Sequence, residues 1–213
     1  MENRQSNAEF YPDSDYEIPK ANFISYWHQI NEVLKTKPKD FLEIGIGNGL
    51  VSNYLKTKGI NVKTFDIDKR LNPTVVGEVD HLAEYFKENS FDTILCAEVL
   101  EHLPFSSFRK SLMEIHKVTK KNVVISLPHH ALQFLLHIKI PLIRKIILTM
   151  RIPFPFHHKW KEGYAHYWEI GWKGYPLKKI KKAMSEFFVI KKVYPVPEKL
   201  YHWFFILEAK KKN

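Results

Sequence analysis

Short apolar runs alternate with amphipathic stretches along most of the chain. Five runs have the length and apolar character of buried strands: residues 40–46, 61–66, 74–77, 91–97 and 122–127. Between them, apolar residues recur at helical spacing in residues 21–37, 50–58 and 106–119. Strands that alternate with helices are typical of a mostly parallel sheet covered on both faces, so the pattern predicts an α/β fold.

The pattern changes towards the carboxyl end. Residues 177–187 have helical spacing, and residues 188–196 and 202–209 have the character of two strands joined by a short loop. Parallel neighbours need a long crossover connection, so we expect these two strands to pair in antiparallel fashion at one edge of the sheet. Residues 129–174 form an insertion ahead of them, with an apolar first part and a second part rich in aromatic residues and histidine.

The composition fits one domain, which we assign to residues 21–213 after a flexible arm at residues 1–20. Hydrophobic residues make up 45% of the 213 residues, enough for a sizeable core. Cys96 is the one cysteine, which excludes a disulfide scaffold and a cysteine-rich zinc module. The polar amino terminus lacks the apolar stretch of a secretory signal, and no run of about 18 apolar residues predicts a spanning helix. We therefore expect a cytoplasmic location.

Positive charge is concentrated in the last third of the chain. The sequence has 33 Lys and Arg against 23 Asp and Glu, a net charge of +10. Residues 1–138 carry 16 basic and 18 acidic residues, whereas residues 139–213 carry 17 basic and 5 acidic residues, a net of +12. This asymmetry indicates a surface for phosphate, lipid headgroups or an acidic substrate, with a solvated basic face as the plainer alternative.

A glycine-rich segment, F-L-E-I-G-I-G-N-G, ends the first predicted strand with Gly45, Gly47 and Gly49. Ligands of open α/β sheets bind beyond the carboxyl ends of the strands, where glycine lets a ligand lie against the backbone. The spacing is G-x-G-x-G, and Leu50 stands where a dinucleotide fold would have its third glycine, which disfavours a nicotinamide oxidoreductase. An acid inside the strand, Glu43, suits an ammonium group better than a phosphate.

Four successive segments resemble the motifs of class I S-adenosylmethionine-dependent methyltransferases. They are F-L-E-I-G-I-G-N-G, F-D-I-D, G-E-V-D-H-L and S-F-D-T-I-L-C-A-E-V-L-E-H-L. The likeness covers residues 23–128 well, and the segment from H-Y-W-E-I-G onward is similar to the ending of the small-molecule branch, which includes quinone-biosynthesis methyltransferases. The resemblance implies a Rossmann-like, doubly wound, seven-stranded sheet whose last strand is antiparallel. We expect the insertion before the last two strands to be helical and aromatic.

The resemblance also implies S-adenosylmethionine as the cofactor and assigns residues to its methionine end. Glu43 and the three glycines match the first motif, which holds the methionine part. Cys96 and Glu98 match the end of the fourth strand, beside the methionine and the sulfonium.

The adenosine end is assigned in the same way. Asp66 matches the acid that accepts hydrogen bonds from the ribose hydroxyls, and Ile67 would flank the adenine. Asp80 matches the acid that accepts from the adenine amino group, with His81 or Leu82 stacking nearby. The sequence lacks the N/D-P-P-Y/W signature found in many nucleic-acid amino methylases at the fourth strand.

Three histidines are candidate bases for removing a proton from a hydroxyl acceptor: His102, His129 and His166. Each could instead be structural, with its ring hydrogen-bonded in a loop or within an aromatic cluster. Glu98, Glu101 and His102 form a cluster of the kind at which some quinone O-methyltransferases of similar sequence bind a divalent cation. A helix-start acid with a structural histidine is the favoured interpretation, and we assign no metal.

Residues 132–151 contain too many apolar residues for a solvated loop, with Lys139, Arg144, Lys145 and Arg151 interleaved. This pattern is typical of an interfacial helix pair that meets anionic headgroups. The favoured alternative is a lid helix packed over the active site. The lid and the membrane-contacting segment are compatible if the substrate is lipid-linked. The protein would then be a peripheral membrane protein.

The leading functional prediction is methyl transfer to a small-molecule or lipid-linked acceptor, at oxygen. A nucleic-acid methyltransferase that uses the basic carboxyl-terminal third on RNA phosphates is the main alternative. A non-catalytic, cofactor-binding protein of the membrane surface is a third class, disfavoured by the intact cofactor motifs.

Overall fold

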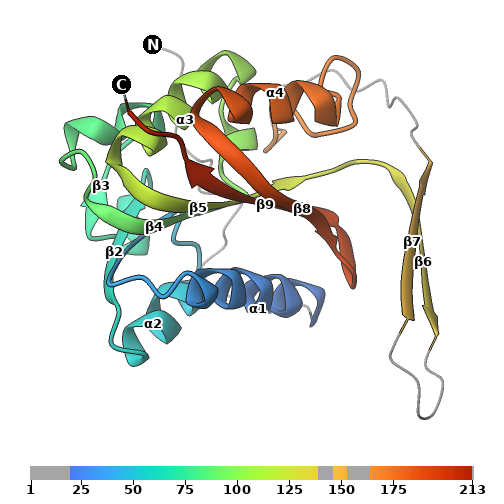
Figure 1. Cartoon of the computed structure of the whole chain (residues 1–213), viewed down its shortest axis with the longest axis horizontal. Coiled ribbons are helices and arrows are strands. Elements are labelled where there is room, and N and C mark those ends of the chain that lie inside the picture. Colours follow the sequence, from blue (N-terminus) through green and yellow to red (C-terminus); the bar gives the residue numbers. More distant parts are fainter. Residues whose placement is uncertain (1–19, 139–145, 153–163, 213) are drawn as a thin grey trace.

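The computed structural model describes residues 20–138, 146–152 and 164–212 (Figure 1). Nearly all of the predicted arm, residues 1–20, lies outside the described residues, and so do Lys139, Arg144 and Lys145 of the insertion. None of the helices in the described ranges is long and apolar enough to cross a membrane.

Seven strands form one mixed sheet in the order β3-β2-β1-β4-β5-β9-β8. The bounds are β1 (Asp40–Ile44), β2 (Asn61–Asp66), β3 (Val75–Val76), β4 (Phe91–Ala97), β5 (Thr119–Pro128), β8 (Phe188–Val196) and β9 (Lys199–Ala209). Strand β9 runs antiparallel to both neighbours, β5 and β8, whereas the strands from β3 to β5 pair in parallel. The predicted seven-stranded sheet with an antiparallel last strand is confirmed.

Helices cover both faces of the sheet, as Figure 1 shows, with α1 (Lys20–Lys35) and α2 (Leu50–Thr57) on one side and α3 (Phe105–Val118) and α4 (Leu177–Phe187) on the other. Successive strand residues point to opposite faces, so β1 feeds two cores. Its Phe41 packs with the α1 and α2 side, and its Leu42 packs with the α3 and α4 side.

Three short 3-10 helices follow strand ends and carry candidate site residues. They are η2 (Lys69–Leu71) after β2, η3 (Val79–Glu84) after β3 and η4 (Leu100–His102) after β4. The strand order reverses between β1 and β4, because β2 continues the sheet on one side and β5 on the other. Ligands of doubly wound sheets bind at such a switch point, outside the carboxyl ends of the strands.

The insertion differs from its predicted structure. Strands β6 (Leu132–Ile138) and β7 (Ile146–Ile152) pair as an antiparallel hairpin, so the expectation of helices in residues 132–151 is wrong. Figure 1 shows the hairpin standing apart from the seven-stranded sheet. The described end of the aromatic second part packs onto the core: Trp168 is fully buried, and its Nε1 donates to the Leu103 carbonyl oxygen at 3.1 Å.

Candidate functional site

The loop between β1 and α2 needs its glycines for conformation and for space. Gly45, Gly47 and Gly49 all have positive φ, at 78°, 52° and 71°. A Cβ at Gly45 would lie 2.3 Å from Cγ2 of Val99, so the loop also packs closely against the segment after β4. A Cβ at Gly47 would meet no atom within 4 Å. The backbone at Gly47 is therefore open to a ligand, as the sequence predicts for this loop.

Glu43 is a buried carboxylate without a full set of partners. It lies near the end of β1 with 3% of its surface exposed, and its Oε2 has no hydrogen-bond partner within the described part of the chain. Burial raises its pKa to about 8, against a smaller opposing effect of Ser52. A buried acceptor of this kind suits a cationic group such as an ammonium, whose charge would stabilise the ionised carboxylate.

Asp66 closes the other side of the glycine loop from the end of β2. Its Oδ2 accepts from the backbone N–H of Ile46, and its Oδ1 accepts from that of Asp68, both at 2.9 Å. These bonds fix the carboxylate, and each oxygen keeps a second lone pair for a ligand hydroxyl. Burial raises the pKa of Asp66 although the backbone bonds act in the opposite direction. Ile67, which follows it, is 40% exposed and offers an apolar surface beside this acid.

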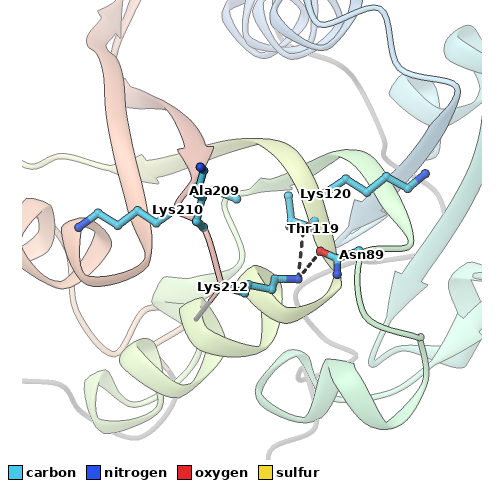
Figure 2. A pocket seen from close by; sticks show the side chains of 7 residues that line it. Asn89, Thr119, Lys120, Ala209, Lys210 and Lys212 are labelled. Carbon is cyan, nitrogen blue, oxygen red and sulfur yellow. Dashed lines mark hydrogen bonds between the residues drawn. The ribbon is translucent and has the colours of Figure 1, made fainter.

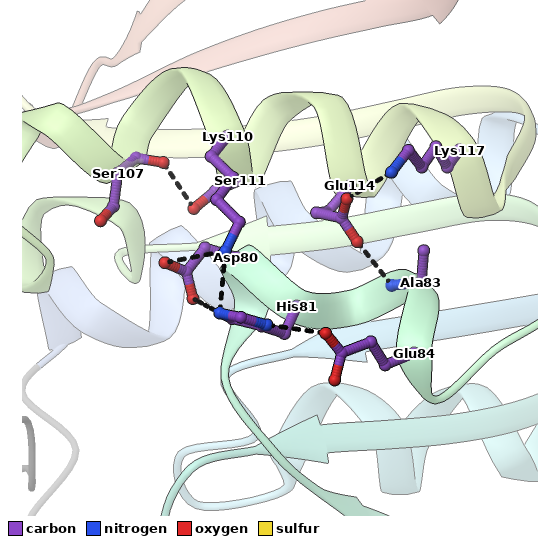
Figure 3. A network of polar contacts seen from close by, with 9 residues as sticks. All are labelled: Asp80, His81, Ala83, Glu84, Ser107, Lys110, Ser111, Glu114 and Lys117. Atoms are coloured by element: carbon purple, nitrogen blue, oxygen red, sulfur yellow. Dashed lines mark hydrogen bonds and ion pairs between the residues drawn. The ribbon is translucent and has the colours of Figure 1, made fainter.

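Asp80 and His81 lie in η3 and face α3 (Figure 3). The buried Asp80 carboxylate lies 3.9 Å from Lys110 Nζ, and Lys110 also donates to His81 Nε2 at 2.8 Å. On its other side, His81 Nδ1 donates to Glu84 at 2.8 Å. The structure thus ties both residues into one polar network, and a ligand amino group would share the Asp80 carboxylate with Lys110.

Strand β4 ends with two groups of different character. Cys96 is fully buried, and burial together with Glu101 and Glu98 raises the pKa of its thiol well above the usual value, so it remains an uncharged packing group. Glu98 has φ of 54°, a left-handed conformation that costs a non-glycine residue about 1–3 kcal/mol. Its Oε1 accepts from Ser126 Oγ at 2.7 Å, and burial raises its pKa to about 7.

An acid and two histidines meet beyond the end of β4. Glu101 is fully buried, and neither of its carboxyl oxygens has a hydrogen-bond partner in the described residues. Burial and the nearby Glu98 raise its pKa well above the usual value. One carboxyl oxygen of Glu101 and one ring nitrogen each of His102 and His166 lie within 4.8 Å of one another. This donor set fits a divalent cation, as it would equally fit a protonated acid beside two neutral imidazoles.

The two histidines are held in defined orientations. His102 Nδ1 donates to the Ala165 carbonyl oxygen at 2.9 Å, and its ring meets that of His166 edge to face, with centroids 4.8 Å apart. The surrounding protein and His166 lower the pKa of His102 to about 4, so it is a neutral ring at pH 7. His166 Nδ1 donates to Glu169 Oε1 at 2.9 Å, which leaves Nε2 as the acceptor nitrogen of the neutral ring.

Glu169 connects His166 to the last strands. Burial raises its pKa, but hydrogen bonds from His166 and Tyr201 outweigh that effect and hold the pKa below its usual value. His130 Nδ1 lies 3.6 Å from the other carboxyl oxygen of Glu169. An ionised acid that orients an imidazole through Nδ1 is the arrangement of a His-acid dyad, in which Nε2 can accept a proton.

His129, the third candidate base, takes part in packing. It is buried, its ring centroid lies 4.5 Å from that of Trp203, and its backbone N–H donates to the Tyr201 carbonyl oxygen. These contacts attach the start of the insertion to β9. A role of His129 as a base stays a prediction.

Several residues of the site were not predicted from the sequence. Tyr26 on α1 hydrogen-bonds to Asn48, and burial followed by the charge of Glu43 raises its pKa. At the other end of the chain, His202 Nε2 lies 3.7 Å from Glu98 Oε2. In the sequence these side chains are aromatic positions of a helix and of a strand, and no local signal separates them from core residues.

A shallow pocket lies at the opposite edge of the sheet, where β5 begins and β9 ends (Figure 2). Three of its lysines have partners for their amino groups: Lys212 Nζ donates to the Asn89 side chain and to the Lys117 carbonyl oxygen, Lys210 Nζ donates to the Ser185 carbonyl oxygen, and Lys120 pairs with Asp40. None of the predicted site residues lines it. We therefore assign the candidate site to the edge that carries the glycine loop.

Comparison with known proteins agrees with this geometry. Residues 42–127, from β1 through β5, match the sequence family described as methyltransferase domain. The matched segment, about two fifths of the chain, is similar in sequence to a methyltransferase domain. The match spans the glycine loop, Asp66, Asp80 and the end of β4, and it confirms the family resemblance predicted from the sequence.

Two relatives match part of the chain. An uncharacterised protein of Methanocaldococcus jannaschii is 35% identical over 89 residues, which cover 38% of this chain and 37% of that protein. A ubiquinone biosynthesis O-methyltransferase of Dechloromonas aromatica is 28% identical over 112 residues, which cover 46% of this chain and 45% of that protein. The matches therefore span less than half the length of either relative.

Solved structures share the fold over nearly the whole chain. The N-methyltransferase NodS from Bradyrhizobium japonicum, solved with S-adenosyl-L-homocysteine, has a TM-score of 0.61 at 11% identity and covers 95% of both chains. At this identity the similarity shows the Rossmann-like methyltransferase fold, in agreement with the predicted fold class.

Proposed function

We propose that this protein is an S-adenosylmethionine-dependent methyltransferase that acts on a small-molecule or lipid-linked acceptor, at oxygen. The observation that carries the proposal is the buried carboxylate of Glu43, whose Oε2 has no partner among the described residues, together with the open backbone of Gly47 and the fixed carboxylate of Asp66. An ammonium, a thioether and a ribose, in that order, match these three features. The relative named as an O-methyltransferase supports an oxygen acceptor, and the neighbour solved with S-adenosylhomocysteine, an N-methyltransferase, supports the cofactor alone.

Each cofactor residue has a role in this proposal. Glu43 holds the methionine ammonium, and the glycine loop allows the chain between ammonium and ribose to lie against the backbone. Asp66 accepts from the ribose hydroxyls with the lone pairs that the Ile46 and Asp68 amides leave unused. Asp80 accepts from the adenine amino group, and Ile67 and His81 border the adenine.

The acceptor binds on the side of Glu98, Glu101, His102, His166 and Glu169. The cofactor supplies a methyl group on a positively charged sulfonium, so the protein mainly aligns the reactants. His166 Nε2 accepts the hydroxyl proton as the acceptor oxygen takes the methyl group, and Glu169 stabilises the imidazolium through Nδ1. Burial raises the pKa values of Glu98 and Glu101 and lowers that of His102, which limits the charge around His166.

An apolar or lipid-linked acceptor is supported by the hairpin β6–β7, which begins two residues after His130 of this side. Its exposed apolar residues lie next to the proposed acceptor side in sequence and offer a route for an apolar chain. A nucleic-acid acceptor rests on the basic carboxyl-terminal third alone, and no contact in the described residues favours it over the lipid-linked class.

Calorimetric titration with S-adenosylhomocysteine tests the cofactor site. We expect the wild type to bind it, to ignore NADH, and to lose at least tenfold in affinity, about 1.4 kcal/mol, in Asp66→Ala. Asp92→Ala is the matched control, because Asp92 also accepts from two backbone N–H groups but lies at the opposite edge of the sheet. Equal binding by the wild type and Asp66→Ala, or none by a folded wild type, would overturn the proposal.

A further inference from the structure

The backbone register of the hairpin places most of its apolar residues on one face. In an antiparallel pair, directly opposed residues share a face, and alternate residues of each strand lie on that same face. Three opposed pairs are Leu132 with Ile152, Phe134 with Met150 and Leu136 with Leu148. Ile138 continues this face along β6. Leu135 lies between Phe134 and Leu136 and therefore belongs to the opposite face.

This apolar face is uncovered in the described structure. Its exposed fractions are 49% for Leu132, 48% for Phe134, 54% for Leu136, 36% for Ile138, 55% for Leu148, 61% for Met150 and 43% for Ile152. A contiguous exposed apolar face of this kind marks an interaction surface, because soluble proteins rarely leave one in water. A two-stranded ribbon is also marginally stable by itself, so a partner would stabilise it.

We propose that this face docks onto an anionic membrane surface. Charge complementarity selects the occupant. Residues 129–161, which contain the hairpin, carry six basic residues and no acidic residue in the sequence. Of these six, Arg151 lies in the described hairpin, where its pairing with Gln133 puts it on the face opposite to the apolar one. A segment with this excess of positive charge is attracted by anionic headgroups. The ribbon rests at the interface and does not span the bilayer, since the outer edges of a two-stranded ribbon leave backbone groups that need water or headgroups.

The same charges argue against the other two occupants. A second copy would carry the same excess of six positive charges in residues 129–161, and this net repulsion between identical segments opposes their association. A lid closed over the site would cover the apolar face, whereas its residues are exposed and Figure 1 shows the hairpin apart from the sheet.

Docking would present the acceptor side of the site to the bilayer. Strand β6 starts two residues after His130, whose ring lies 3.6 Å from Glu169. The hairpin is therefore joined by a short connection to the residues assigned to acceptor binding. The docking itself rests on the register, exposure and charge of the hairpin and does not depend on methyl transfer; only its link to a lipid acceptor rests on the proposed function.

Co-sedimentation of the full-length protein with vesicles tests the docking. Vesicles of phosphatidylcholine with phosphatidylglycerol are compared with vesicles of phosphatidylcholine alone, at low and at high salt. Leu136→Glu changes the apolar face, and Leu135→Glu is the matched control, the same substitution one residue away on the opposite face. Both variants are checked for wild-type circular dichroism and wild-type affinity for S-adenosylhomocysteine.

We expect binding to the anionic vesicles that salt weakens, and a loss of about tenfold or more in Leu136→Glu against less than about threefold in Leu135→Glu. No binding to anionic vesicles, or equal losses in the two variants, would overturn the docking. A dimer that forms without vesicles and that only Leu136→Glu dissociates would identify a second copy as the occupant. If the protein binds S-adenosylhomocysteine but does not bind vesicles, the docking is refuted and the proposed function stands. If it binds vesicles but not S-adenosylhomocysteine, the proposed function is refuted and the docking stands.

Discussion

Replacing Gly47 by alanine isolates the open backbone that the cofactor site requires. Gly47 has φ of 52°, and an added Cβ would meet no atom of the described residues within 4 Å. Gly59 provides a matched control, because its φ is 75°, its Cβ would also meet nothing within 4 Å, and it lies in the turn before β2 at the opposite edge of the sheet. The two substitutions impose the same backbone strain and differ in what the new methyl group faces.

The structure sets the expected magnitudes. Positive φ costs an alanine about 1–2 kcal/mol, partly offset by the smaller entropy of its unfolded chain, so each variant loses about 1 kcal/mol of unfolding free energy. Neither methyl group clashes with the protein, so no further loss is expected. The methyl group in Gly47→Ala occupies the space where the ligand approaches the backbone, and we expect its affinity for S-adenosylhomocysteine to fall at least tenfold, about 1.4 kcal/mol.

Urea unfolding measures the free energy of unfolding, and calorimetry on the same preparations measures the affinity for S-adenosylhomocysteine. Gly59→Ala should unfold like Gly47→Ala and bind like the wild type. If Gly47→Ala keeps the wild-type affinity, the ligand does not lie against this loop and the reasoning is refuted. A large loss of stability in Gly47→Ala alone would show that the space above the loop is occupied by the protein itself.

Three further predictions concern other residues of the site. Burial raises the pKa of Glu43 to about 8, so the folded state keeps a proton that the unfolded chain releases. The free energy of unfolding should therefore fall as the pH rises from 4.5 to about 8, by about 5 kcal/mol at most. Urea titrations of Glu43→Gln should show a weaker pH dependence than those of the wild type. His166→Ala should lower kcat with the acceptor about 100-fold while its affinity for S-adenosylhomocysteine in calorimetry stays within about twofold, whereas a loss of both would make His166 structural. Gly45→Ala should lose about 2 kcal/mol or more in urea unfolding because its Cβ meets Val99, and adding Val99→Ala should recover part of that loss; a second substitution that only adds to the loss would contradict the contact.

The elements of the sheet and its helices could be predicted because local signals mark them. Gly59 ends α2, Pro38 separates α1 from β1, and the apolar runs of β1, β2 and β4 are each bounded by polar or glycine residues. The structure confirms these elements with shifts of a few residues at their ends. The number of strands and the antiparallel last strand are not properties of local pattern and followed from the family resemblance, and the strand order comes from the structure.

The hairpin could not be predicted in this way. In L-Q-F-L-L-H-I, the apolar residues fit a helical face as well as a strand. The basic residues that follow among further apolar residues, up to Arg151, suggested an interfacial helix. Among the described residues, β6 finds its partner in β7 and not in the core, so pairing between the two segments decides the structure.

The acceptor side could be predicted only in pieces. Glu101 and His102 were recognised as a cluster because they are adjacent in sequence, and H-Y-W-E was recognised as a possible pocket lining. Their meeting depends on the long-range contact that brings Ala165 and His166 onto η4, a separation of 63 residues for the His102 bond. Nothing in the local sequence of β9 indicates that Tyr201 would hydrogen-bond to Glu169.

Amide chemical-shift mapping with S-adenosylhomocysteine tests the central claim most directly, because it reports both binding and place. The account predicts shifts at the glycine loop, at Ile67 after β2 and at Glu98 after β4, with little change at Asn89 and Lys212 of the lysine-lined pocket. No shifts at saturating ligand, or shifts confined to that pocket at the opposite edge of the sheet, would contradict it.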